Sequence, residues 1–124
     1  MKRILVVDDE KSANALSTEY LRLAGFQVAS CFDGESALKI LESDPGFDLI
    51  VLDKRMPGMG GIAAGKAIRR GERTSRIPIV LLSASLQPSQ LAEVDDELRA
   101  DAYIPKPFRP KDLLSAVERL LRSA

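Results

Sequence analysis

Apolar residues in this chain gather in short runs, and four of the runs end on polar residues. The runs cover residues 4–7, 49–52, 79–82 and 102–105. The polar residues that follow them are Asp8 with Asp9, Asp53, Ser83 and Lys106. Short runs rich in Val, Ile and Leu predict strands that are buried on both faces of a parallel sheet. Since ligands of such a sheet bind beyond the carboxyl ends of its strands, we expect these side chains to share one rim.

The segments between the runs carry apolar residues at three- and four-residue steps, which is the spacing of amphipathic helices. The first predicted helix covers residues 12–24, ends before Gly25 and has on its apolar face Ala13, Leu16, Tyr20, Leu23 and Ala24. A second helix opens at 33–34 and closes at 43–46, and a short third helix lies around 62–68. A fourth begins at Pro88 and carries Leu91, Val94 and Leu98, and a fifth follows Pro110 with its apolar residues within 113–121. Residues 26–30 predict a further strand.

Five strands thus alternate with five helices, and the connections are too long for hairpins. This alternation predicts an α/β fold in which a five-stranded parallel sheet in the order 2-1-3-4-5 has helices on both faces, the doubly wound flavodoxin-like arrangement. The order places the first and third strands side by side. It therefore brings Asp8, Asp9 and Asp53 together although they are far apart in the chain.

Length and composition narrow the possible functions. A chain of 124 residues without a repeat or a linker predicts one domain over residues 1–124 and no effector domain. Its net charge of zero gives no reason to expect nucleic-acid binding or membrane attraction. No apolar stretch is long enough to cross a membrane, and the first residues are not typical of a signal peptide. A single cysteine, Cys31, suits the reducing cytoplasm, where we expect the protein. The absence of histidine excludes an imidazole base or ligand within this chain.

The predicted rim has the residues needed for phosphoryl transfer. Mg²⁺ prefers oxygen ligands and relieves the repulsion among crowded carboxylates such as Asp8, Asp9 and Asp53. Asp53, at the end of the central strand, is the best-placed nucleophile, because a carboxylate can accept a phosphoryl group as an aspartyl phosphate. The charge on the transferred group needs compensation, for which Lys106 offers a positive charge and Ser83 a hydrogen bond.

Four motifs cover the same residues: V-V-D-D-E at 6–10, L-D-K-R-M-P-G-M at 52–59, L-S-A at 82–84 and Y-I-P-K-P-F at 103–108. On these motifs the chain closely resembles, over essentially its full length, the receiver domains of two-component response regulators. By position, the resemblance implies that Asp53 is the phosphoacceptor, Asp9 a direct Mg²⁺ ligand and Asp8 a ligand through water. The other implied roles are a metal-binding backbone carbonyl at Arg55, a switch hydroxyl at Ser83, a switch aromatic at Tyr103, the family's lysine at Lys106 and a cis peptide bond between Lys106 and Pro107.

The resemblance also implies a mechanism and partners. A sensor histidine kinase or a histidine phosphotransfer protein would donate the phosphoryl group from its own phosphohistidine. Ser83 would then move toward the phosphoryl oxygens and Tyr103 would turn into the vacated space. The surface of the fourth helix, fifth strand and fifth helix would change and regulate a downstream protein. The chain would be a signalling domain that catalyses only its own phosphorylation and dephosphorylation.

Several positions depart from the family pattern or need a separate interpretation. Gly60 stands where Asp is common and Gly61 follows it, so we expect a more mobile loop. Arg99 stands where a helix-ending glycine is common, and Pro105 indicates an edge strand or a strand end. The cluster of Arg69, Arg70, Arg73 and Arg76 is typical of a solvated helix end, with a docking surface as the alternative.

Other functions remain open on the residues alone. Each rim residue, taken singly, is also typical of a helix cap, a turn or a solvated charge. An aspartate-based phosphatase of the haloacid dehalogenase type needs Asp-x-Asp after the first strand, where this chain has Glu10 as the third residue and no cap segment. An FMN-binding flavodoxin needs a Ser/Thr/Gly-rich phosphate loop there. The remaining alternative is a receiver-like interaction module that works without phosphorylation.

Overall fold

The computed structural model describes residues 1–56, 58–83 and 98–122. The strands are β1 (Arg3–Val7), β2 (Gln27–Cys31), β3 (Leu49–Asp53), β4 (Ile79–Ser83) and β5 (Ala102–Pro105). The helices are α1 (Lys11–Leu23), α2 (Gly34–Ser43), α3 (Gly61–Arg70) and α5 (Pro110–Arg122). The helix predicted to begin at Pro88 lies outside the described residues, except for Leu98 at its end. None of the helices in the described ranges combines the length and apolarity needed to cross a bilayer.

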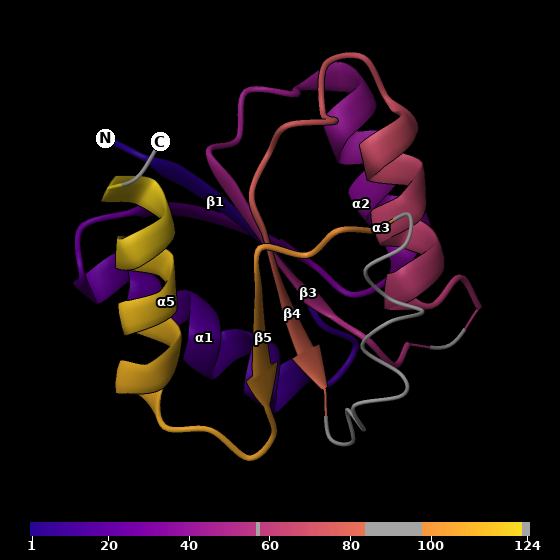
Figure 1. Cartoon of the computed structure of the whole chain (residues 1–124). Coiled ribbons are helices and arrows are strands. Elements are labelled where there is room, and N and C mark those ends of the chain that lie inside the picture. Colours follow the sequence, from indigo (N-terminus) through magenta and orange to yellow (C-terminus); the bar gives the residue numbers. More distant parts are fainter. Residues whose placement is uncertain (57, 84–97, 123–124) are drawn as a thin grey trace.

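All five strands are parallel and lie in the order β2-β1-β3-β4-β5, which confirms the predicted topology. The helices α1 and α5 cover one face of the sheet, and α2 and α3 cover the other (Figure 1). Successive side chains of a strand point to opposite faces, so a strand between two helical layers must be apolar at every position. This is why the inner strands β1, β3 and β4 consist of continuous apolar runs, whereas β2, at the edge, is only partly buried.

The ends of the helices follow local chemistry. At the start of α2, the side chain of Asp33 accepts a hydrogen bond of 2.7 Å from the backbone N–H of Ser36 and caps the helix. After α1 the chain turns at Gly25, whose φ of 101° lies in the left-handed region that glycine adopts most easily. α5 starts at Pro110, where the missing N–H would have no helical partner. These boundaries lie within a few residues of the predicted ones.

The buried face of α1 differs from the predicted one. The residues that α1 buries are Asn14, Ser17, Thr18 and Leu21. Leu16, Tyr20 and Leu23, which the periodicity placed in the core, are 59%, 43% and 79% exposed. The periodicity correctly identified a helix with an apolar stripe, but the face that packs on the sheet is the neighbouring, mostly polar one. The prediction of the core face was therefore wrong, and the reason lies in the hydrogen bonds of Asn14 described below.

Arg69, at the end of α3, is a buried connector. Its side chain is 7% exposed, and its guanidinium uses all five N–H donors. The acceptors are the backbone carbonyls of Ser75, Ile77, Leu98 and Arg99 and the carboxylate of Asp101. The interpretation of Arg69 as part of a solvated helix end was therefore wrong, because it fastens α3 to the segments that lead into β4 and β5.

The segment before β5 is also held by close packing. A Cβ at Gly65 of α3 would lie 2.1 Å from Cδ1 of Leu98, so any larger residue would force this fully buried leucine to shift. Arg99, the next residue, has a φ of 51°, the left-handed conformation for which the family pattern prefers glycine. β5 then ends at Pro105, at the edge of the sheet, which agrees with the prediction for this proline.

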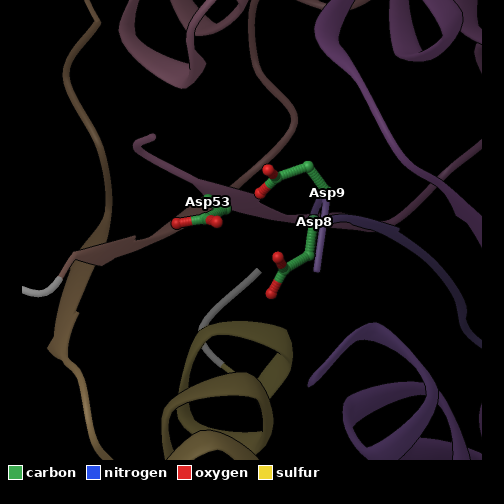
Figure 2. A group of neighbouring side chains, drawn as sticks. All are labelled: Asp8, Asp9 and Asp53. Atoms are coloured by element: carbon green, nitrogen blue, oxygen red, sulfur yellow. The ribbon is translucent and has the colours of Figure 1, made fainter. Parts of the chain in front are cut away.

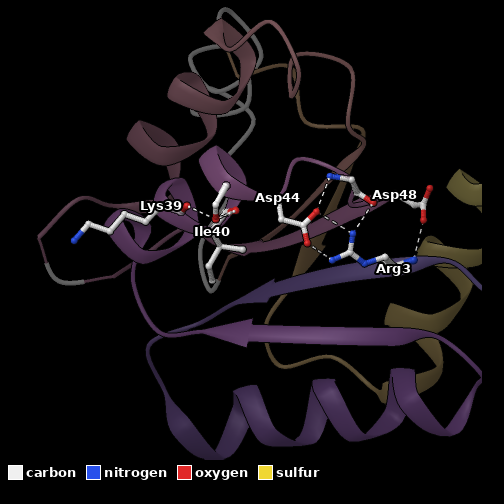
Figure 3. Close-up of polar contacts among 7 residues, drawn as sticks. Arg3, Lys39, Ile40, Asp44 and Asp48 are labelled. Atoms are coloured by element: carbon white, nitrogen blue, oxygen red, sulfur yellow. Dashed lines mark hydrogen bonds and ion pairs between the residues drawn. The ribbon is translucent and has the colours of Figure 1, made fainter.

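A second arginine anchors the same end of the sheet, where the strands start. Arg3, at the start of β1, forms an ion pair with Asp44 beyond the end of α2 (Figure 3). Its backbone N–H donates to the Asp48 carboxylate at 2.8 Å, and its guanidinium stacks 4.4 Å from the centre of the Phe47 ring. These contacts fix the connection from α2 to β3 and thereby the position of the strand that ends on Asp53.

Candidate functional site

Three carboxylates meet at the carboxyl ends of two adjacent strands. Asp8 and Asp9 follow β1, and Asp53 is the last residue of β3 (Figure 2). One oxygen from each of the three carboxylates lies within 4.8 Å of the others. Asp8 and Asp53 are 1% and 6% exposed, whereas Asp9 is exposed to solvent. The site therefore has a buried floor and one open side.

A lysine provides the positive charge at this floor. The Nζ atom of Lys106, just after β5, lies 3.4 Å from Oδ2 of Asp8 and 3.3 Å from Oδ2 of Asp53. The backbone N–H of Lys106 donates to the carbonyl of Ser83 at 2.8 Å, which continues the pairing of β5 with β4. The peptide bond between Lys106 and Pro107 is cis. The structure thus brings Asp8, Asp9, Asp53 and Lys106 together from three strand ends.

The electrostatics of the site are dominated by burial and by the crowding of negative charge. Burial, and then the nearby charge of Asp8, raise the pKa of Asp53 to about 6, although Lys106 opposes the shift. Burial lowers the pKa of Lys106, but the carboxylates of Asp8 and Asp53 together raise it further, so its pKa lies above the ordinary lysine value. Lys106 therefore stays charged, and the ionised form of Asp53 carries an energetic cost.

The donor set fits a hard divalent cation. Carboxylate oxygens are the ligands that Mg²⁺ prefers, and three carboxylates facing one ammonium leave an excess of negative charge that such a cation would offset. Asp9 also lines a shallow pocket with Lys54, Arg55 and Met56. Arg55, whose carbonyl the family resemblance assigns to the metal, follows Asp53 by two residues in the sequence. The acidic triad is typical of the Mg²⁺ site of receiver domains.

The two remaining predicted site residues lie on β4 and β5. Ser83 is the last residue of β4 and is 2% exposed. The register pairs Leu81 with Tyr103 and Ser83 with Pro105, so alternation places Ser83 and Tyr103 on the same face of the sheet. Tyr103 is half-buried against the core on the α2 and α3 side. Its hydroxyl is buried and has no hydrogen-bond partner among the described residues.

The second glycine of the loop after Asp53 has a packing role. A Cβ at Gly61 would lie 1.9 Å from the backbone carbonyl oxygen of Asp53, whereas one at Gly60 would meet nothing closer than 3.6 Å. The N–H of Gly61 donates to the carbonyl of Lys54 at 2.9 Å. The first turn of α3 thus packs directly against the backbone of Asp53. Glycine at position 61 is needed for this packing, a reason that differs from the expected mobility of the loop.

Comparison with known proteins agrees with this geometry. The family described as response regulator receiver domain matches residues 4–118. The chain belongs to this family. It is a receiver signalling domain of the two-component type, and its buried acidic pocket is consistent with a phosphoacceptor site.

Individual receiver proteins are similar along nearly all of the chain. The transcriptional regulatory protein CpxR of Escherichia coli (strain K12) is 40% identical over 123 residues, which are 98% of this chain and 50% of CpxR. CpxR of Klebsiella pneumoniae is 39% identical over the same share. The chain therefore spans about half the length of the curated relatives it matches.

Solved receiver structures have the same fold. The chemotaxis protein CheY4 of Vibrio cholerae has a TM-score of 0.90 at 31% identity, over 97% of this chain and 98% of that chain. The receiver domain of Francisella response regulator 1452 has a TM-score of 0.89 at 28% identity, over 99% and 98%.

One residue at the site escaped the sequence analysis. Asn14 of α1 is 2% exposed, and its side-chain amide donates to the backbone carbonyls of Asp8 and Cys31. The periodicity assigned the apolar positions of this helix to the core and passed over Asn14. A polar residue about one turn into a helix that follows closely on the acidic pair was the available signal, because such a side chain can reach back to the strand end.

Proposed function

We propose that Asp53 is the phosphoacceptor of a two-component pathway and receives its phosphoryl group from a phosphohistidine of a sensor histidine kinase or a histidine phosphotransfer protein. The observation that carries this proposal is the position of Asp53: a buried carboxylate among two other carboxylates, with an ammonium 3.3 Å away. A receiver domain implies a two-component kinase as its partner.

The transfer needs one nucleophile and compensation of charge. An oxygen of Asp53 forms a bond to phosphorus while the bond from phosphorus to the donor imidazole breaks and its electron pair leaves with the imidazole. Asp9, Asp53 and the carbonyl of Arg55 would hold Mg²⁺, with Asp8 acting through water, and the bound cation would offset the charge of the phosphoryl oxygens. Lys106 would pair with one of those oxygens, because its ammonium already lies beside Asp53.

Two further residues would convert phosphorylation into a change of surface. Ser83 would turn its hydroxyl toward the phosphoryl group, and Tyr103 would turn into the space that Ser83 leaves. Their position on one face of the sheet supports this coupling. The unpartnered hydroxyl of Tyr103 among the described residues also supports it, because a buried hydroxyl without a hydrogen bond favours an alternative position that satisfies it. The surface at β5 and α5 would then change for a downstream protein or effector domain.

The donor protein has a suitable place to dock. The apolar stripe of α1, with Leu16 and Tyr20 exposed, lines a groove with Phe108 and Leu113, and Lys106 forms part of the same groove. An amphipathic helix buries its apolar face in such a groove. Because Lys106, which lies 3.3 Å from Asp53, lines this groove, a helix bound there would hold its phosphohistidine near Asp53.

The test is the mass of the intact protein after incubation with acetyl phosphate, with and without Mg²⁺. We expect the gain of one phosphoryl group only with Mg²⁺, and none in Asp53→Asn. Glu118→Gln, which removes an exposed carboxylate of α5, is the control and should behave as wild type. A gain that persists in Asp53→Asn would assign the acceptor elsewhere. No gain from acetyl phosphate or from a purified histidine kinase would refute the proposal in favour of an interaction module that works without phosphorylation.

A further inference from the structure

The side chain of Asn14 joins the ends of β1 and β2. Its Nδ2 donates to the backbone carbonyl of Asp8 at 3.0 Å and to that of Cys31 at 2.9 Å. Its Oδ1 accepts a hydrogen bond of 3.3 Å from the hydroxyl of Thr18, one turn further along α1. Both donors and the acceptor of the amide are therefore used, in a position that is almost entirely buried.

The bond to Asp8 completes the fixation of this residue. The backbone N–H of Asp8 donates to the carbonyl of Cys31 at 3.2 Å, and its Oδ1 accepts from the backbone N–H of Glu10 at 3.0 Å. Its other carboxylate oxygen faces Lys106. With the carbonyl held by Asn14, every polar group of Asp8 has a partner.

The same bond controls where Asp9 projects. The carbonyl of Asp8 and the N–H of Asp9 belong to one planar peptide unit, so holding that carbonyl fixes the plane and the direction in which the Asp9 Cα leaves it. Asp9 is exposed, and its carboxylate lies beside two others of the same charge. Mutual repulsion tends to move it toward solvent, and the hydrogen bond from Asn14 opposes the rotation of the peptide that this movement needs.

The packing of α1 has the same origin. The helix buries Asn14, Ser17 and Thr18 instead of its apolar stripe, although the apolar face would gain more from leaving water. The orientation is explained by the two hydrogen bonds from Asn14 to the strand-end carbonyls, since the buried carbonyl of Asp8 would otherwise lose this donor, and losing a donor at a buried carbonyl is costly.

We infer that Asn14 is a positioning residue for the divalent-cation site, which holds the peptide between Asp8 and Asp9 so that the three carboxylates converge. This inference rests on the cation site of the proposed function, but it concerns the geometry of the site before any transfer. Outer partners that orient metal ligands typically contribute about 10–100-fold to metal affinity. A similar contribution is expected here.

The test is the affinity for Mg²⁺, measured by titration calorimetry without any phosphodonor, together with the free energy of unfolding in urea. Asn14→Ala should bind Mg²⁺ about tenfold or more weakly. The matched control is Thr74→Val, which removes a buried hydrogen bond of 2.6 Å from the Thr74 hydroxyl to the carbonyl of Ile68, far from the rim. Both variants should lower the free energy of unfolding, but Thr74→Val should keep its Mg²⁺ affinity within about twofold.

The outcomes separate positioning from general stability. A folded Asn14→Ala variant with wild-type Mg²⁺ affinity, or an equal loss in the control, would overturn the inference. If Asn14→Ala does not fold, Thr18→Val replaces it in the test. Thr18→Val removes only the hydrogen bond to the amide oxygen of Asn14 and should weaken Mg²⁺ binding about twofold to fivefold. Unchanged Mg²⁺ binding in Thr18→Val would overturn the inference. A wild-type protein that binds Mg²⁺ but accepts no phosphoryl group would refute the proposed function alone. One that binds no Mg²⁺ would overturn both.

Discussion

Replacing Asp53 by Asn should stabilise the metal-free protein, and the gain should depend on pH. Burial and the charge of Asp8 raise the pKa of Asp53 from an ordinary value near 4 to about 6. A carboxyl whose pKa is higher in the folded protein binds its proton more tightly when folded. The folded state therefore loses stability as the pH rises through the window between about 4 and about 6.

The magnitude follows from the size of the shift. A rise of about 2 pKa units corresponds to about 3 kcal/mol of destabilisation once both states are ionised, at pH 7.5, and to about 1 kcal/mol at pH 4.5. Asparagine has nearly the same shape and no charge, so Asp53→Asn removes this cost. The stability difference between variant and wild type should thus be about 2 kcal/mol more favourable at pH 7.5 than at pH 4.5. Other effects of the substitution that do not depend on pH cancel in this comparison.

Urea denaturation in EDTA, followed by circular dichroism at the two pH values, measures the difference. Glu118→Gln, which removes an exposed carboxylate, controls for the change in net charge and should alter the free energy of unfolding by less than about 1 kcal/mol at both. Saturating Mg²⁺ should narrow the gap, because a bound cation offsets the repulsion. A stability difference of equal size at both pH values would refute the reasoning and mean that Lys106 balances burial and Asp8 together. A variant that loses stability relative to wild type between pH 4.5 and pH 7.5 would refute it too, and would mean that Lys106 outweighs them.

Two further substitutions test how the site is held. Gly61→Ala places a Cβ 1.9 Å from the carbonyl oxygen of Asp53 and should lower the free energy of unfolding in urea by about 3 kcal/mol or more. Gly60→Ala, whose Cβ would have its nearest contact at 3.6 Å, should change it by no more than about 1 kcal/mol. Similar costs for the two variants would contradict the close approach of α3 to Asp53. Arg69→Ala removes the donor to four carbonyls and one of the two donors to the Asp101 carboxylate, and should cost about 3 kcal/mol. Arg73→Ala, at an exposed position, should cost less than about 0.5 kcal/mol. Equal losses would mean that the buried guanidinium does not contribute more than a surface one.

The arrangement of the rim could be predicted because it depends on chain order alone. Strands alternating with helices leave few topologies, since parallel strands need right-handed crossovers. Once the order was 2-1-3-4-5, the residues after the first and third strands had to be neighbours, wherever the helix boundaries fell. Asp8, Asp9 and Asp53 are brought together for this reason, and Lys106 reaches them from the edge strand β5.

The orientation of α1 could not be predicted in the same way. The helical spacing locates a stripe at Leu16, Tyr20 and Leu23, but hydrophobicity alone does not say which face of a helix has hydrogen-bonding partners waiting in the sheet. The carbonyl of Asp8 takes its hydrogen bond from Asn14 on the adjacent face, and the carbonyl of Cys31, which already accepts from the N–H of Asp8, takes a second one from the same amide. Satisfying these buried acceptors outweighs the burial of the stripe, which remains available to a partner.

The order of apolar runs and the polar residue that ends each of them thus determine the fold and the acidic rim, because strand periodicity and crossover handedness are local properties of the chain. The tertiary structure alone decides which side chains hold this rim in place. The amide of Asn14, the space at Gly61 and the buried guanidinium of Arg69 depend on backbone atoms that are distant in sequence or on the opposite side of a turn. Such contacts follow from how the layers pack, and a one-dimensional pattern of apolar and polar residues does not contain them.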